Sequence, residues 1–153
     1  MIAVGTSLPE FELKDQHGMA VSSSTLRGNN VLLSFHPLAW TGVCQRQMES
    51  LEMNASEFNN HNAKAFGISV DSAPCKKAWA ESIGVKITPL LADFWPHGNL
   101  AQKLGIFREE DGISERANMI VDKQGSIRWM KVYPIGDLPD LDEVFEVLKD
   151  LNS

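Results

Sequence analysis

The sequence predicts an α/β fold with a mixed β-sheet and helices on both of its faces. Short apolar runs of strand length alternate with longer segments in which apolar residues recur at helical spacing. Near the end of the chain, two strand-like runs flank a tight turn and precede a last helix. Alternating strands and helices give parallel strand pairs, whereas a hairpin adds an antiparallel pair. The sheet is therefore expected to be mixed.

The first half of the chain is expected to begin with a small hairpin at 11–21, whose turn lies at 15–18. The apolar run Val31–Phe35 predicts a buried strand. Pro37 ends that strand, because proline cannot donate a hydrogen bond to a strand ladder. Apolar residues at helical spacing then predict one helix from about 43 to 61.

A second buried strand is expected at 65–70, followed by a helix that Ser72 caps and that runs to about Ile83, next to Gly84. The remaining elements are a short strand at 90–92, a helix at 99–104, strands at 117–121 and 127–132, and a helix at 141–151. Since a cysteine follows the first main strand, a thioredoxin-like architecture in a single domain, 1–153, accounts for this order most simply.

Composition and charge argue against some classes of function. The 153 residues are 43% hydrophobic, which is enough for one core, and the net charge is −6. This acidic balance, without a basic stripe, argues against nucleic acid or an anionic membrane as partner. We expect no secretory signal at the N-terminus. Two cysteines are too few for a disulfide scaffold, so a reducing, cytoplasmic compartment is expected.

Cys44 is the strongest candidate for a reactive residue. It follows the strand and turn that end at Pro37 and falls in the first turn of the next predicted helix. Free backbone N–H groups and the helix dipole favour an anion there, and the thiolate is the nucleophilic form of cysteine. The alternative is that Cys44 is only a small, buried apolar side chain.

Three stretches of sequence resemble a known family. Pro37, Thr41 and Cys44 match the active-site pattern P-x-x-x-T-x-x-C of the peroxiredoxins, the AhpC/TSA superfamily. The segment 35–45 is most similar to the AhpE-type subgroup, as are Asp93-Phe94-Trp95-Pro96-His97-Gly98 and Gly112-Ile113-Ser114-Glu115-Arg116. The resemblance extends from about Pro9 to the last helix.

The resemblance implies a thiol-dependent peroxidase that reduces hydrogen peroxide and organic hydroperoxides. Cys44 would be the peroxidatic cysteine and would become a sulfenic acid. Thr41 would direct its hydroxyl at the thiolate and the peroxide, and Pro37 would shield the sulfur from water. Arg116 would stabilise the thiolate and the leaving oxygen. Gln47 would orient Arg116.

Some of these residues also have structural interpretations. Thr41 could serve only as a helix N-cap, and Arg116 could be a surface arginine paired with Glu115 or Glu109. Two positions depart from the common pattern. Gln45 stands where many peroxiredoxins have proline, although the AhpE type shares the glutamine. His36 replaces a commonly aromatic residue, and a partly buried, hydrogen-bonded histidine is expected there.

Cys75 leaves the reaction cycle open. In some peroxiredoxin subfamilies a resolving cysteine in the corresponding helix attacks the sulfenic acid, which would give a Cys44–Cys75 disulfide. The AhpE type generally relies on an external thiol instead. Cys75 also lies on a helical stripe with Ala78, Trp79 and Ile83, so it could simply belong to the core.

The resemblance implies neither a metal nor a prosthetic group. Partners would be a hydroperoxide and a reductant, which could be a thioredoxin- or glutaredoxin-like protein or a low-molecular-weight thiol. A homodimer is also implied, with Trp40, Phe94 and Trp95 as aromatic anchors. The alternative function is a non-enzymatic redox sensor that uses the same oxidation of Cys44. A thiol–disulfide oxidoreductase is disfavoured because no C-x-x-C motif is present.

Overall fold

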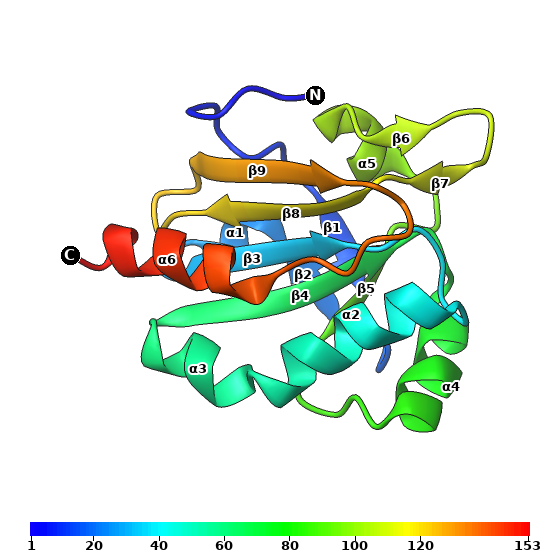
Figure 1. Ribbon diagram of the computed structural model, residues 1–153. Coiled ribbons are helices and arrows are strands. Elements are labelled where there is room, and N and C mark those ends of the chain that lie inside the picture. Colours follow the sequence, from blue (N-terminus) through cyan, green and yellow to red (C-terminus); the bar gives the residue numbers. More distant parts are fainter.

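The computed structural model describes residues 1–153 (Figure 1). Its strands are β1 (Glu12–Lys14), β2 (Ala20–Ser22), β3 (Asn30–Phe35), β4 (Ala63–Ser69), β5 (Leu90–Ala92), β6 (Phe107–Arg108), β7 (Ile113–Ser114), β8 (Arg116–Val121) and β9 (Ile127–Tyr133). Its helices are α1 (Ser23–Leu26), α2 (Gly42–Met53), α3 (Ala55–Asn60), α4 (Ala73–Ile83), α5 (Asn99–Leu104) and α6 (Leu141–Leu151). No helix is both long enough and apolar enough to cross a membrane.

A seven-stranded sheet in the order β2-β1-β5-β4-β3-β8-β9 forms the centre of the molecule, and β6 and β7 form a separate pair. Strands β3, β4 and β5 run parallel to one another, whereas β1, β2, β8 and β9 pair antiparallel with their neighbours. The predicted mixed sheet is therefore confirmed.

Most predicted elements form within a few residues of the expected bounds, but the single helix predicted for 43–61 is wrong. The chain leaves the helical path at Asn54, where φ is −102° and ψ is 16°, and α3 starts afresh. The Asn54 side chain donates to the carbonyl of Ser50 at 2.7 Å. A side chain that bonds to nearby backbone competes with the helical pattern, which accounts for the break. Helix α1 and strands β6 and β7 were not predicted.

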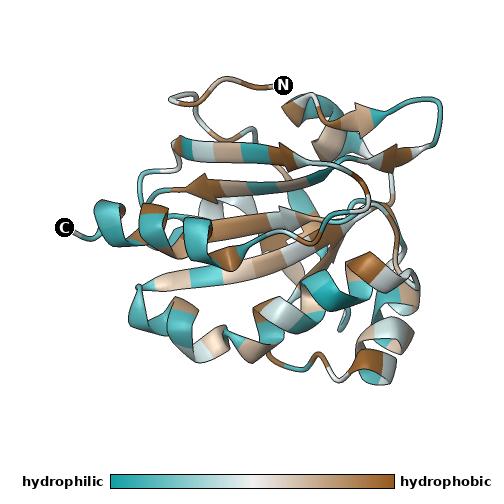
Figure 2. Ribbon diagram, viewed as in Figure 1, coloured by the Kyte–Doolittle hydropathy of each residue, from teal (hydrophilic) through white to brown (hydrophobic).

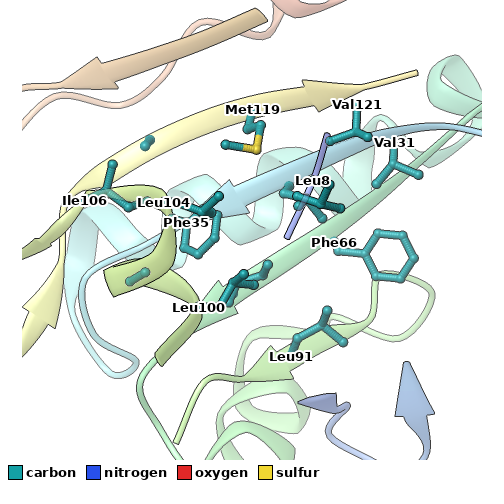
Figure 3. Packing of buried hydrophobic residues seen from close by; sticks show 14 of the residues in the cluster. Leu8, Val31, Phe35, Phe66, Leu91, Leu100, Leu104, Ile106, Met119 and Val121 are labelled. Carbon is teal, nitrogen blue, oxygen red and sulfur yellow. The ribbon is translucent and has the colours of Figure 1, made fainter. Parts of the chain in front are cut away.

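Alternation along the central strands divides the core between the two faces of the sheet. On one face Val31, Leu33 and Phe35 pack under α1 and α5, and Figure 3 shows Leu100 and Leu104 of α5 beside Phe35. On the other face, α2, α3, α4 and α6 cover the sheet. Figure 1 shows α2, α3 and α6 on the near side and α1 behind it. In Figure 2 hydrophobic colouring gathers on the central strands and hydrophilic colouring on the outer helical turns.

Helix α2 packs closely against strand β4, and this contact fixes the distance between its first turn and the sheet. A Cβ atom added to Gly67 of β4 would lie 2.2 Å from the sulfur of Met48 in α2. Only glycine permits this approach without displacing the methionine. Met48 and Leu51 are fully buried as a result, and they anchor the helix that carries Cys44.

Candidate active site

Two helices begin at the same edge of the sheet, and each carries a cysteine in its first turn. Strands β3 and β4 are parallel neighbours, with Phe35 opposite Ile68, so their carboxyl ends meet. Cys44 is the third residue of α2, after β3, and Cys75 is the third residue of α4, after β4. The N–H groups of a first helical turn have no intrahelical acceptor and favour a negative charge.

Arg116 reaches Cys44 from the neighbouring antiparallel strand. Ala117 of β8 pairs with Phe35 of β3, so Arg116 lies just beyond the end of β3, beside the active-site loop. Its Nη1 atom lies 3.4 Å from the Cys44 sulfur. The cysteine is 1% exposed and the arginine is buried as well. The alternative of a surface ion pair for Arg116 is wrong, because Arg116 is buried and forms no ion pair with Glu115 or Glu109.

A buried polar network holds the Arg116 guanidinium in place. Nη1 donates to Gln47 Oε1 at 2.7 Å, and Nε and Nη2 donate to the carbonyl of Ile135 at 2.9 and 2.7 Å. The Gln47 amide nitrogen donates to Ser34 Oγ at 2.8 Å, which fixes the amide so that its oxygen faces the arginine. The Ser34 hydroxyl in turn donates to Asn118 at 2.7 Å. The oxygen acceptors of this arginine, the Gln47 amide and the Ile135 carbonyl, are uncharged.

The loop between β3 and α2 separates the sulfur from solvent. Pro37 and Ala39 are buried, while Leu38, Trp40 and Thr41 are exposed. Thr41 occupies the N-cap position of α2, but its side chain makes no capping bond. Its hydroxyl donates instead to the Leu38 carbonyl at 2.7 Å, so its oxygen lone pairs are free to accept a hydrogen bond from a bound substrate. Trp40 holds a left-handed backbone with φ of 67°.

His36 and Lys76 form a buried pair behind the loop. The lysine is 0% exposed, and its Nζ atom lies 3.2 Å from His36 Nε2. The expected hydrogen-bonded histidine is confirmed, although it is fully rather than partly buried. Burial lowers the pKa of His36 well below its usual value, and the charge of Lys76 lowers it further. His36 is therefore neutral at pH 7.

Cys75 lies at the edge of the core rather than within it. Its backbone N–H donates to the cap residue Ser72 at 3.3 Å, and its thiol points to Asp71 at 3.9 Å. The other carboxylate oxygen of Asp71 accepts the backbone N–H of Ala39 at 2.9 Å. Asp71 thus links the loop that precedes Cys44 to the helix start that carries Cys75.

The predicted apolar stripe of α4 is confirmed for Cys75, Trp79 and Ile83, which belong to or pack against the core, but it is wrong for Ala78. Ala78 is exposed, and the buried residues of the helix are Lys76, Trp79 and Ala80. These three have the spacing of one helix face, and this spacing is the signal in the sequence that places Lys76 with Trp79 and Ala80. Ser34 carried no comparable signal in the sequence.

The arrangement supplies what a reaction of a thiolate with an electrophilic oxygen requires. The sulfur lies at a helix N-terminus, a cation contacts it, and the exposed Thr41 hydroxyl lies in the loop just before it. No three His, Cys, Asp or Glu side chains converge on a point where they could hold a metal ion.

Comparison with known proteins assigns the family. The model of the AhpC/TSA family matches residues 4–130. The chain belongs to the AhpC/TSA family of peroxiredoxins. It is 42% identical over 141 residues to proteins named alkyl hydroperoxide reductase E from Mycobacterium tuberculosis and Mycobacterium bovis, a match that spans 92% of either sequence. A peroxiredoxin from Pyrococcus furiosus is 34% identical over 99% of this chain and 72% of its own length.

Solved peroxiredoxin structures share the fold. The crystal structure of Enterococcus faecalis AhpC superposes with a TM-score of 0.90 at 27% identity, over 98% of this chain and 92% of that one. The reduced 2-Cys peroxiredoxin of Plasmodium vivax gives a TM-score of 0.87. The thioredoxin-like architecture is therefore confirmed. This peroxiredoxin is accordingly an oxidoreductase, a peroxidase that works through a thiol.

Proposed function

We propose that this peroxiredoxin reduces hydrogen peroxide and organic hydroperoxides with Cys44 as its nucleophile. One observation carries the assignment: the buried Arg116 guanidinium lies 3.4 Å from the Cys44 sulfur and has only neutral groups as its other partners. A cation without a carboxylate partner stabilises an ionised thiol, and also the negative charge that develops on the departing oxygen.

The reaction follows from these contacts. The Cys44 thiolate attacks the terminal oxygen of the hydroperoxide, so that an S–O bond forms while the O–O bond breaks. The sulfur loses two electrons and becomes a sulfenic acid, and the other oxygen leaves as water or an alcohol after taking up a proton. Thr41 orients the substrate through its hydroxyl, and Pro37 keeps water from the sulfur. Gln47 acts as a positioning residue for Arg116.

Turnover distinguishes this enzyme from a redox sensor built on the same cysteine. In the presence of excess dithiothreitol, one equivalent of protein should consume many equivalents of hydrogen peroxide at a steady rate. A sensor would consume one equivalent and stop. Consumption that ends at one equivalent, although reductant remains, would reject the enzymatic proposal.

We further propose that Cys75 resolves the sulfenic acid by forming a disulfide with Cys44 and releasing water. Both residues begin helices at one edge of the sheet, and Asp71 contacts the Cys75 thiol as well as the loop that precedes Cys44. A thioredoxin- or glutaredoxin-like protein or a small thiol, in a reducing compartment such as the cytoplasm, would then reduce the disulfide.

Intact mass after one equivalent of hydrogen peroxide tests the role of Cys75. Without reductant, the wild-type protein should lose two hydrogens, and peptide mapping should link Cys44 to Cys75. The Cys75→Ser variant serves as the control and should instead gain one oxygen on Cys44. A wild-type protein that gains one oxygen while Cys75 remains open to alkylation would overturn the disulfide and leave an external thiol to resolve Cys44.

We also propose a homodimer that buries the aromatic side chains around the active-site loop. Trp40 follows β3, and Phe94 and Trp95 follow β5, so they lie at the edge where the parallel strands end. All three are exposed, Trp95 by 81%, and exposed aromatic groups are typical anchors of interfaces.

Sedimentation should give a dimer, which Trp95→Glu weakens. A comparable change in the exposed Ile87, before β5, should leave it intact. A monomeric wild type would reject the proposal.

A further inference from the structure

The first half of β4 has an open edge, although β4 itself lies inside the sheet. Strand β5 pairs with β4 only from Gly67 to Ser69, so the residues of β4 before Gly67 have β3 on one side and no strand on the other. In Figure 1 this part of β4 forms the lower margin of the sheet, above α3. An unpaired edge of this kind is a template for the addition of another strand.

The backbone of Ala65 faces this open edge. The Gly67 N–H donates to the Pro89 carbonyl at 3.0 Å, so it points toward β5. The Ser69 carbonyl accepts the Asp93 N–H at 2.8 Å on the same side. Alternate residues of a strand direct their N–H and C=O groups to the same side, which places both groups of Ala65 on this side as well. Neither group bonds to the segment that precedes β5. The edge therefore offers one free donor and one free acceptor.

Two features prevent the chain itself from covering this edge. Extending the parallel register would place Thr88 opposite Ala65, and the next N–H would have to come from Pro89, which has none. The segment before β5 is also tied to α2, because the Glu52 carboxylate accepts the backbone N–H groups of residues 86–88 at 2.8, 2.9 and 2.9 Å. These bonds hold the segment against α2, and the edge of β4 stays open.

A hollow lies on each face of the sheet beside the open edge. The larger one, of about 660 Å³, extends from β4 to Leu51, Ala55 and Phe58 of α2 and α3. The smaller one, of about 230 Å³, lies on the opposite face beside Leu26 and Val31. Successive side chains of an added strand would point alternately into the two hollows. Sites that bind peptides by strand addition obtain their specificity in this way.

The charge around the edge indicates which kind of chain fits. Lys64 is the only charged residue that lines either hollow, although the whole chain has a net charge of −6. Two copies of this protein joined through this edge would bring their Lys64 side chains together, and like charges across a strand pair are unfavourable. A carboxylate on the incoming strand would instead pair with the exposed Lys64 ammonium.

We propose that the open edge of β4 is an interaction surface that binds an extended, apolar segment of another protein with a carboxylate placed beside Lys64. The Ala65 N–H and carbonyl bond to the backbone of this segment, and the two hollows take its side chains. The surface lies beside the last turn of α2, whereas Cys44 lies in the first turn of the same helix. Binding is therefore independent of the proposed reaction with peroxide.

A peptide titration followed by NMR tests the proposal. The probe is Asp-Val-Thr-Val-Thr-Val-Asp with both ends blocked, added to the ¹⁵N-labelled full-length protein. Binding should be saturable, should shift the amide signal of Ala65 and should slow its hydrogen exchange. The peptide Lys-Val-Thr-Val-Thr-Val-Lys should bind about two- to fivefold more weakly, the difference that an exposed ion pair contributes. The absence of saturable shifts up to about 1 mM of the acidic peptide would overturn the proposal.

Two variants test whether the peptide binds at this edge. Lys64→Glu should reverse the preference between the two peptides, whereas Lys77→Glu, which changes an exposed lysine of α4, is the matched control and should not. Ala65→Pro removes the N–H that faces the edge but no bond to β3, so it should abolish binding. A Lys64→Glu protein with an unchanged preference would contradict the proposal, and this exposed change does not depend on whether Ala65→Pro folds. Lys64→Glu should consume peroxide at the wild-type rate, so failure of this proposal is distinguishable from failure of the peroxidase proposal.

Discussion

Replacement of Cys44 by serine is expected to reduce peroxide consumption to the background rate of the reductant alone. A serine hydroxyl is not ionised near neutral pH and cannot be oxidised to a sulfenic acid equivalent, so neither S–O bond formation nor recycling remains. The change replaces one buried sulfur atom by oxygen and leaves the rest of the side chain unaltered, so the fold should persist. Peroxide consumption and circular dichroism measure the two effects separately. A Cys44→Ser protein that consumes peroxide at the wild-type rate would show that the nucleophile lies elsewhere.

Arg116→Met should lower the second-order rate constant for hydrogen peroxide by about 100- to 1,000-fold, the range found when one donor to a developing negative charge is removed. The methionine keeps much of the buried volume but loses the contacts with Cys44, Gln47 and Ile135. Stopped-flow measurement of the oxidation of Cys44 reads the effect directly.

Two further variants separate charge from geometry at this position. Arg116→Lys retains the positive charge but cannot donate to the sulfur, the amide and the carbonyl in one plane, so it should recover only part of the rate. Arg128→Met removes an exposed arginine of β9 that contacts Asp122 and should leave the rate unchanged. An Arg116→Met protein with a wild-type rate would remove Arg116 from the mechanism.

Much of the fold could be predicted because the hydrophobic periodicity and the residues typical of helix ends indicated the same helices. Ser72 and Gly84 mark the two ends of α4, and both were identified from the sequence. The break at Asn54 was missed because the apolar spacing continues across it to Phe58, which is buried in the same core. Helix α1 and strands β6 and β7 are too short for a periodic pattern to identify them.

Some residues of the site lie close together in the sequence, whereas others reach the site only because two strands pair. Cys44 and Thr41 lie within one short motif, and helix-start reasoning located them. Arg116 lies beside Cys44 because β8 pairs with β3. The resemblance implied that Arg116 belongs to the site, whereas the composition of the chain does not indicate which strands pair. Lys76 was missed because lysine is almost always exposed, and only the packing of α4 shows it to be buried.

The absence of any carboxylate among the hydrogen-bond partners of Arg116 links the redox state of the sulfur to the stability of the protein around it. In the proposed cycle, the reduced sulfur supplies the negative charge that the other partners of Arg116 lack. Oxidation to a neutral sulfenic acid removes that charge and leaves the buried guanidinium with neutral partners alone. The first turn of α2 is then least stable just after peroxide has reacted, when Cys44 must move to meet a second thiol. The same electrostatic imbalance favours return to the reduced state.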